Sequence, residues 1–283
     1  MSAAAPAPPE AGRASGSAPG APSGPGPRSA TNSIEKACAV LRALAGFDAP
    51  LRLVDIAAAA GLHQATAARI LENLAENGLV RRHGRRRLYA LSPLAAALGE
   101  ASRAGRLREA AQASLLRLAA LTGDTAMLSV RCGDEALYIA HEFGAHPIRV
   151  NTLGIGRRRP LGVGAGALAL LAAAPAEEAA AILDRIAPAL DRFPRLTRPL
   201  LARAAAAARA RGHARIADLI NPGGGGVAVA LALPEQGLTA ALSVVGPTAR
   251  ILAREDQLAA LLRDEAELIR RRMRGQGGAK SSI

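Results

Sequence analysis

The side chains best suited to recognising another molecule lie close together in the first third of the chain. Gln64, Thr66 and Arg69 fall within about two helical turns, and five arginines follow within residues 81–87. Glutamine and arginine can each make paired hydrogen bonds to the edge of one base. Arginine also pairs with the phosphate backbone. These residue types at this spacing predict double-stranded DNA as the partner.

Apolar spacing predicts that Gln64 and its neighbours lie on a helix. Four apolar residues recur at i, i+3, i+4 and i+7, which places them on one stripe: Ala67, Ile70, Leu71 and Leu74. Ala65 and Arg69 lie opposite this stripe. A shorter helix at 54–60 precedes it, and Gly61 between the two can take the left-handed conformation that ends a helix. The pair predicts a helix-turn-helix, whose second helix enters the major groove.

The arginine run predicts a β-wing behind that second helix. Two segments that favour strands flank Gly84, at 79–80 and 89–91, which indicates a hairpin. Its tip would hold arginines against DNA phosphates: Arg82, Arg85 and Arg86. A solvated charged loop is the alternative. Glu72 and Glu76 also point away from the apolar stripe, and phosphates would repel them, so base contacts are expected only from Gln64, Ala65, Thr66 and Arg69.

Charge and cysteine content restrict the class of protein. The net charge of +13 over 283 residues favours a polyanionic partner, nucleic acid before an acidic membrane surface. Cys38 and Cys132 are too few for a disulfide framework or a metal site, and Cys38 is expected in the core. No apolar run has the length of a membrane span, and the first 30 residues lack a secretion signal. A cytoplasmic protein without a membrane partner is expected.

Composition divides the chain into five segments. Residues 1–30 are Ala, Pro, Gly and Ser with almost no large apolar residue, which predicts a disordered tail, and a second tail is expected at 275–283. Between them we expect a winged helix-turn-helix domain at 31–92, a linker helix at 93–105 and an α+β domain at 106–274. Linker residues such as Leu94 and Leu98 would help hold two DNA-binding domains at symmetric half-sites.

Local patterns give the elements of these segments. Asn32 or Ser33 can cap the first helix, and Glu35 completes a capping box with Asn32. The inner face of that helix is expected to hold Ile34, Ala37, Cys38, Leu41 and Leu44. In the α+β domain, strands are expected at 125–131, 136–141, 148–153, 227–233 and 238–245. Helices are expected at 106–121, 164–173, 176–186, 198–211 and 254–273.

With these segments laid out, the chain resembles the IclR family of transcription regulators over residues 33–273. The segments that carry the resemblance are 33–37, 56–57, 61–62, 69–71, 78–81, 89–91, 156–161, 212–213, 221–223 and 240–247. The resemblance implies a two-domain α+β protein, with a winged helix-turn-helix and a GAF-like effector-binding domain joined by a linker helix. It also implies operator binding as a homodimer or tetramer and a response to a small-molecule effector, often a carboxylate or an aromatic compound.

The same resemblance implies where an effector would bind. The positions are Met127, Leu161, Gly164, Ala165, Gly166, Asp218, Gly226 and Ser243. Gly162, Gly164 and Gly226 stand where the family usually has larger or polar side chains, so space and apolar lining from Met127, Leu128, Val227 and Val229 are expected. Such a site favours an aromatic or alicyclic carboxylate. Its carboxylate would meet the Ser243 hydroxyl and backbone N–H groups near Ala165 and Gly166, with Asp218 near a ligand hydroxyl or at the rim.

Residues 162–167 also satisfy the pattern G-x-G-x-x-A, which leaves three interpretations open. A dinucleotide site would use Asp184 as the ribose-binding acid, but a strand directly before the glycines is missing. The glycines could instead allow close helix packing, or the helix start could hold a ligand carboxylate. His141, Glu142 and Cys132 lack the partners of a hydrolase centre. A regulator without enzymatic activity or cofactor is therefore expected, and a small-molecule-processing enzyme with an accessory basic domain is the alternative.

Overall fold

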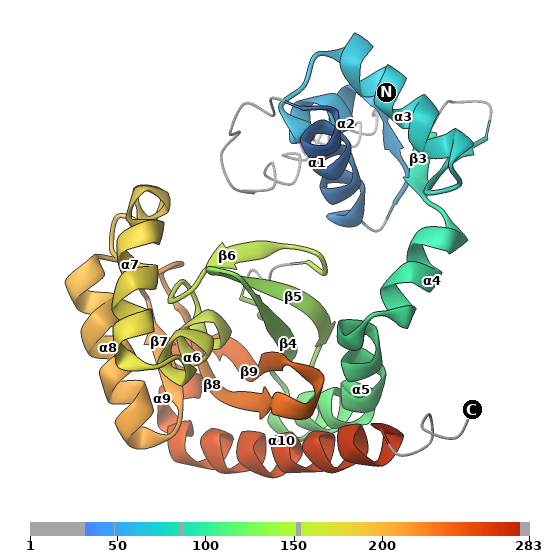
Figure 1. Cartoon of the computed structure of the whole chain (residues 1–283). Coiled ribbons are helices and arrows are strands. Elements are labelled where there is room, and N and C mark those ends of the chain that lie inside the picture. Colours follow the sequence, from blue (N-terminus) through green and yellow to red (C-terminus); the bar gives the residue numbers. More distant parts are fainter. Residues whose placement is uncertain (1–31, 48, 85–87, 151–153, 278–283) are drawn as a thin grey trace, which may run out of the picture.

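The structure is a computed structural model that describes residues 32–47, 49–84, 88–150 and 154–277 (Figure 1). The tail expected at 1–30 lies outside the described residues, as do 278–283 of the second tail and the wing residues Arg85 and Arg86.

Three helices and a small sheet form the N-terminal domain. The helices are α1 (Ser33–Ala45), α2 (Leu53–Ala60) and α3 (Gln64–Glu76). The strands β1 (Leu51–Arg52), β2 (Val80–His83) and β3 (Leu88–Leu91) form an antiparallel sheet in the order β1-β3-β2. The predicted helix-turn-helix and wing hairpin are thereby confirmed. The additional strand β1 is too short to give a sequence signal.

Local signals account for the ends of these helices. The Asn32 side chain accepts a hydrogen bond from the Glu35 backbone N–H at 2.8 Å, and the capping box is complete. Gly61 ends α2 in the left-handed conformation with φ of 66°. The four residues of the α3 stripe are all buried and, together with α1 and α2, form the core of the domain.

The expected inner face of α1 is partly wrong. Ile34 and Cys38 are exposed, whereas Val40, Ala43 and Leu44 are buried and Ala37 and Leu41 pack beside them. The contact face is therefore turned around the helix, because α2 and α3 pack against its second half. Ile34 lies in the first turn, ahead of that contact.

The linker is shorter than expected because a serine stops it. α4 (Pro93–Ala101) is capped by the Ser92 hydroxyl, and it ends at Ser102, which also caps α5 (Arg103–Thr122). The Ser102 hydroxyl accepts a hydrogen bond from the Gly105 N–H at 3.0 Å. A Cβ on Gly105 would lie 2.3 Å from the Gly99 carbonyl oxygen, so only glycine permits this bend.

A six-stranded antiparallel sheet is the centre of the C-terminal domain, in the order β6-β5-β4-β9-β8-β7. Its strands are β4 (Thr125–Cys132), β5 (Glu135–Glu142), β6 (Arg158–Pro160), β7 (Ala214–Ala217), β8 (Gly224–Leu233) and β9 (Leu238–Pro247). A short 3₁₀ turn, Pro234–Gln236, joins the last two. β4 and β5, which match the strands expected at 125–131 and 136–141, pair antiparallel and are joined by the turn at Gly133-Asp134.

Helices cover both faces of this sheet and create two cores (Figure 1). α6 (Ala165–Ala173), α7 (Ala176–Leu190) and α8 (Arg198–Arg211) pack on one face. α5, α9 (Thr248–Ala253) and α10 (Glu255–Gly277) pack on the other. The α+β prediction is confirmed, and the helices lie on both faces of the sheet.

Several expected elements differ. Residues 148–150 form no strand, and 151–153 lie outside the described residues; the strand that pairs with β5 is β6. β7 and α9 were not predicted, because both are short. α10 continues to Gly277, which removes the first residues of the expected tail at 275–283. Within the described ranges, no helix is long and apolar enough to cross a membrane.

Candidate functional site

The face of α3 that is predicted to contact DNA is exposed, as its sequence indicates. Gln64, Ala65 and Arg69 are exposed, and Thr66 is half-buried beside them. Glu72 and Glu76 are exposed further along the helix. The first two turns thus offer hydrogen-bonding side chains to a groove, and the later turns offer negative charge.

The wing carries an ion pair that the sequence did not predict. Arg82 on β2 donates to the Glu72 carboxylate on α3 at 3.0 Å, and its guanidinium lies 6.0 Å from the centre of the Tyr89 ring. Both partners remain more than half exposed. Arg82 therefore reaches the helix and neutralises one of the two carboxylates that would repel DNA.

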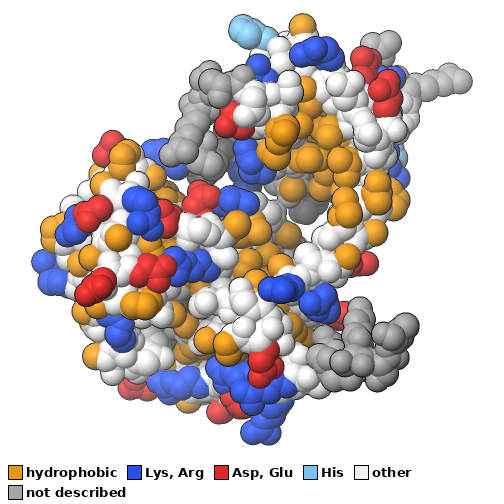
Figure 2. Space-filling view, viewed as in Figure 1, with side chains coloured by type: hydrophobic (Ala, Val, Ile, Leu, Met, Phe, Trp, Pro, Cys, Tyr) orange, Lys and Arg blue, Asp and Glu red, His pale blue; other side chains and the backbone are white. Residues whose placement is uncertain are grey.

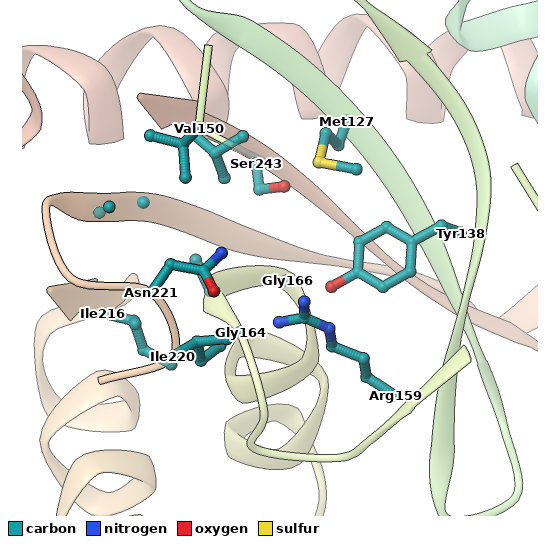
Figure 3. Close-up of a pocket in the computed structure, with 15 residues that line it drawn as sticks. Met127, Tyr138, Val150, Arg159, Gly164, Gly166, Ile216, Ile220, Asn221 and Ser243 are labelled. Atoms are coloured by element: carbon teal, nitrogen blue, oxygen red, sulfur yellow. The ribbon is translucent and has the colours of Figure 1, made fainter. Parts of the chain in front are cut away.

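The C-terminal domain contains a cavity between the sheet and the start of α6. The space, including its open mouth, is about 550 Å³. Its wall comes from all six strands, the start of α6 and two loops, and includes Met127, Tyr138, Val150, Arg159, Ile216, Ile220, Asn221, Ser243 and Val245 (Figure 3). Glycines and Ala165 complete the lining at Gly164, Gly166 and 224–226. Most of the wall is apolar, with a few polar groups directed inward, as in small-molecule sites.

The structure brings together six of the eight residues expected at an effector site around this cavity: Met127, Gly164, Ala165, Gly166, Gly226 and Ser243. Leu161 is not among the lining residues, because its side chain is fully buried in the core formed with α6 to α8. Asp218 is also outside the lining. Its carboxylate accepts hydrogen bonds from the Gly223 N–H at 2.7 Å and the Thr248 hydroxyl at 2.9 Å, so it stabilises a turn.

The expected apolar lining is wrong at three positions. Leu128, Val227 and Val229 belong to the core on the opposite face of the sheet, with α5 and α10. Side chains alternate between the two faces of a strand. Since Met127 points into the cavity, Leu128 must point away from it.

The glycines do not leave the space that was expected. A Cβ on Gly226 would lie 2.9 Å from Val245 Cγ1 and 3.1 Å from Ala165 Cβ, because α6 packs directly on β8. A Cβ on Gly162 would lie 3.1 Å from Leu201. Both positions serve close packing, and residues 224–226 are part of β8 rather than a free turn.

Three polar side chains of the cavity were missed by sequence reasoning, Tyr138, Arg159 and Asn221. The Tyr138 hydroxyl and Arg159 Nη1 lie 3.2 and 3.9 Å from the point where a Gly164 Cβ would stand. Burial raises the pKa of Tyr138, with Arg159 acting in the opposite direction, and burial lowers the pKa of Arg159. The only sequence signal was the arginine run at 157–159, in which nothing distinguished one arginine from the next.

The start of α6 is open toward the cavity. Gly164 is the N-cap with φ of 112°, and no side chain caps the first turn. The strand before it, β6, runs antiparallel to its neighbour β5, and Asp184 on α7 is paired with Arg198 at 2.5 Å. A dinucleotide-binding unit needs a parallel strand there and a free acid, so that interpretation does not fit this fold.

Comparisons with known proteins agree with both domains. The family described as IclR helix-turn-helix domain matches residues 33–84, and the family described as bacterial transcriptional regulator IclR C-terminal matches residues 101–271. A search of curated proteins gives no match.

Solved structures share the whole fold. An IclR homolog from Microbacterium hydrocarbonoxydans, complexed with 4-hydroxybenzoate, is 24% identical, with a TM-score of 0.69 over 86% of this chain and 99% of that one. An IclR transcriptional regulator from Alicyclobacillus acidocaldarius is 24% identical, with a TM-score of 0.68 over 85% and 98%. IclR of Thermotoga maritima is 23% identical, with a TM-score of 0.61 over 86% and 98%.

The two family matches together span the winged domain and the cavity-bearing domain in the order that the fold shows. The chain therefore belongs to the IclR family of helix-turn-helix transcription regulators.

Proposed function

We propose that this regulator binds operator DNA through α3 and the wing and responds to a small aromatic or alicyclic carboxylate. The observation that carries the proposal is the cavity at the start of α6, in a chain that also has a DNA-binding domain. Its wall is mostly apolar and carries a few inward-directed polar groups, as small-molecule sites do. A solved relative holds 4-hydroxybenzoate, a compound of this class.

The lining divides into two chemically different parts. Met127, Val150, Ile216, Ile220 and Val245 form the apolar part, where ring burial contributes about 25 cal/mol per Å². The N–H groups of Ala165 and Gly166 begin α6 and favour an anion there. The Ser243 hydroxyl stands beside them. A ring acid matches both parts in one orientation, with its ring in the apolar part and its carboxylate at the start of α6.

DNA recognition is assigned to two surfaces. Gln64, Ala65, Thr66 and Arg69 contact bases in the major groove, and Arg82, Arg85 and Arg86 contact phosphates. Leu94 and Leu98 on α4 are exposed, and Figure 2 shows hydrophobic side chains along this helix. These leucines join a homodimer or tetramer, which places two winged domains at symmetric half-sites.

A thermal-shift screen tests the ligand class, since a ligand that binds only the native state raises its melting temperature. The panel contains 4-hydroxybenzoate, benzoate, cyclohexanecarboxylate, pyruvate and glyoxylate. Ring acids are expected to raise the melting temperature, and Val245→Phe, which fills the cavity, is expected to remove the shift while DNA binding stays unchanged. A response to pyruvate or glyoxylate alone would contradict the proposed class.

A DNA selection experiment with the wild-type protein tests operator binding and its response to the ligand. Selection from random DNA should yield a two-fold symmetric operator, and a ring acid from the panel should change its affinity. Equal affinity for operator and scrambled DNA would contradict operator-specific binding.

A further inference from the structure

Arg159 brings a positive charge to the cavity without a carboxylate beside it. Its neighbour Arg158 pairs with Glu135 at 3.2 Å. Arg159 lies on the other side of β6, with its guanidinium 5.9 Å from the Phe193 ring. Among the described residues, no Asp or Glu forms an ion pair with it. Figure 3 shows its guanidinium directed toward the space below the Tyr138 hydroxyl.

The helix terminus beside this guanidinium adds positive potential, and a buried hydroxyl without a partner lies next to the same helix start. The uncapped first turn of α6 lies next to it, since Arg159 Nη1 is 3.9 Å from the Cβ position of Gly164. A helix N-terminus acts as about half a positive charge. The Ser129 hydroxyl is 1% exposed, lies 3.0 Å from the Cβ position of Gly166, and has no hydrogen-bond partner in the described chain. The described residues that line the cavity include no carboxylate.

The partly buried guanidinium has lost part of its hydration, and nothing in the described wall restores it by ion pairing. The lowered pKa of Arg159 has the same physical cause. An anion between the guanidinium and the α6 turn would be attracted by both positive charges.

We infer that Arg159, Tyr138 and the first turn of α6 form an anion clamp that makes the cavity select a carboxylate over an uncharged ligand of the same shape. The guanidinium donates two parallel hydrogen bonds to the carboxylate oxygens, and the Tyr138 hydroxyl and the α6 N–H groups donate to the remaining lone pairs. The ring then points toward Met127 and Val245. The inference rests on the proposed function, because it names the selective residue of the same cavity.

Benzoate and benzamide test the clamp, since they have nearly the same shape and differ in charge. Hydrogen bonds to a charged group contribute about 1.5–3 kcal/mol, so the wild type should bind benzoate roughly tenfold to a hundredfold more tightly. Arg159→Met should abolish this preference. Tyr138→Phe should reduce it by a smaller factor. Arg158→Met is the matched control: it removes an adjacent arginine, already paired with Glu135, and should keep the preference.

The melting temperature of each variant, measured without ligand, gives a second test of the clamp. Arg159→Met should melt at or above the wild-type temperature, because it removes an uncompensated charge, whereas Arg158→Met should melt at or below it. A lower melting temperature for Arg159→Met would assign this arginine a structural role and overturn the clamp. If that variant does not fold, the wild type decides alone, since equal binding of benzoate and benzamide overturns the inference.

The outcomes separate the clamp from the proposed function. If the wild type responds to ring acids and Arg159→Met keeps the benzoate preference, the clamp is wrong and the proposed ligand class stands. If no ring acid shifts the wild type, the proposed ligand class is wrong and the clamp falls with it.

Discussion

Neutralising Glu72 is expected to strengthen DNA binding by releasing Arg82. The two side chains form an ion pair at 3.0 Å between α3 and the wing, and they are 57% and 51% exposed. An exposed pair of this kind contributes only about 0–1 kcal/mol to stability, so Glu72→Gln should fold normally. The guanidinium can then contact a phosphate without competition from Glu72, and the remaining repulsion between Glu72 and DNA disappears.

The magnitude follows from counterion release. Each new phosphate contact steepens the dependence of log K on log salt by about 0.9. When the salt concentration rises fourfold, a variant with one additional phosphate contact therefore loses about 3.5-fold more DNA affinity than the wild type loses. Arg82→Ala should accordingly cost more affinity in the Glu72→Gln background than in the wild type, because in the wild type Glu72 competes for the same guanidinium.

The assay is a set of DNA titrations with the wild type, the two single variants and the double variant. The salt concentration is varied between about 50 and 200 mM, a range over which the number of phosphate contacts changes the affinity strongly. Glu76→Gln is the matched control, since Glu76 lies exposed on the same helix and pairs with no cation among the described residues. If Glu76→Gln changed the slope of log K against log salt as much as Glu72→Gln does, removal of a negative charge alone would explain the effect. Equal costs of Arg82→Ala in both backgrounds would refute the competition.

Three further predictions concern other parts of the molecule. Gln64→Ala or Arg69→Ala should each reduce discrimination between operator and scrambled DNA by about 1–3 kcal/mol, measured by competition titration; retained discrimination in both would move base contact away from α3. Leu98→Glu, at a side chain 57% exposed on α4, should shift the protein toward monomers in sedimentation velocity, with unchanged helix content. Burial raises the pKa of Glu265, but hydrogen bonds from Arg117 and Ser114 hold it below the usual 4.5. This carboxylate thus stabilises the fold fully above about pH 4.5 and loses that contribution as the pH falls through its folded pKa, and Glu265→Gln should flatten this acid limb in urea titrations.

The winged domain was predictable because its signals are local. The capping box at Asn32, the glycine at Gly61 and the four-residue stripe of α3 each act within a few residues, and each is present in the structure. The face of α1 was not predictable to the same degree. Which side of a helix is buried depends on where its partners lie, and α2 and α3 contact α1 in its second half.

The cavity shows the opposite case, because its wall is assembled from segments far apart in the chain. Side chains alternate along a strand, so the face of each residue can be predicted only when the face of one residue in that strand is known. Leu128, Val227 and Val229 lie in the core on the opposite face for this reason. Asp218 is an acid of the kind that binds ligands, yet its Oδ1 accepts hydrogen bonds from the Gly223 N–H and the Thr248 hydroxyl and so belongs to a turn. Neither fact is visible before the turns and the sheet are known.

The arginine run at 157–159 shows why charge in a sequence does not give its role. Arg157 extends to the loop after α1, where its guanidinium lies 5.7 Å from the Phe47 ring, and burial lowers its pKa. Arg158 pairs with Glu135, and Arg159 enters the cavity. Adjacent residues of the edge strand β6 point to opposite faces, so like charges next to each other in sequence meet different surroundings. Arg159, which is expected to have the largest effect on ligand selectivity, therefore lies in the run 157–159, whose sequence indicated only a family resemblance.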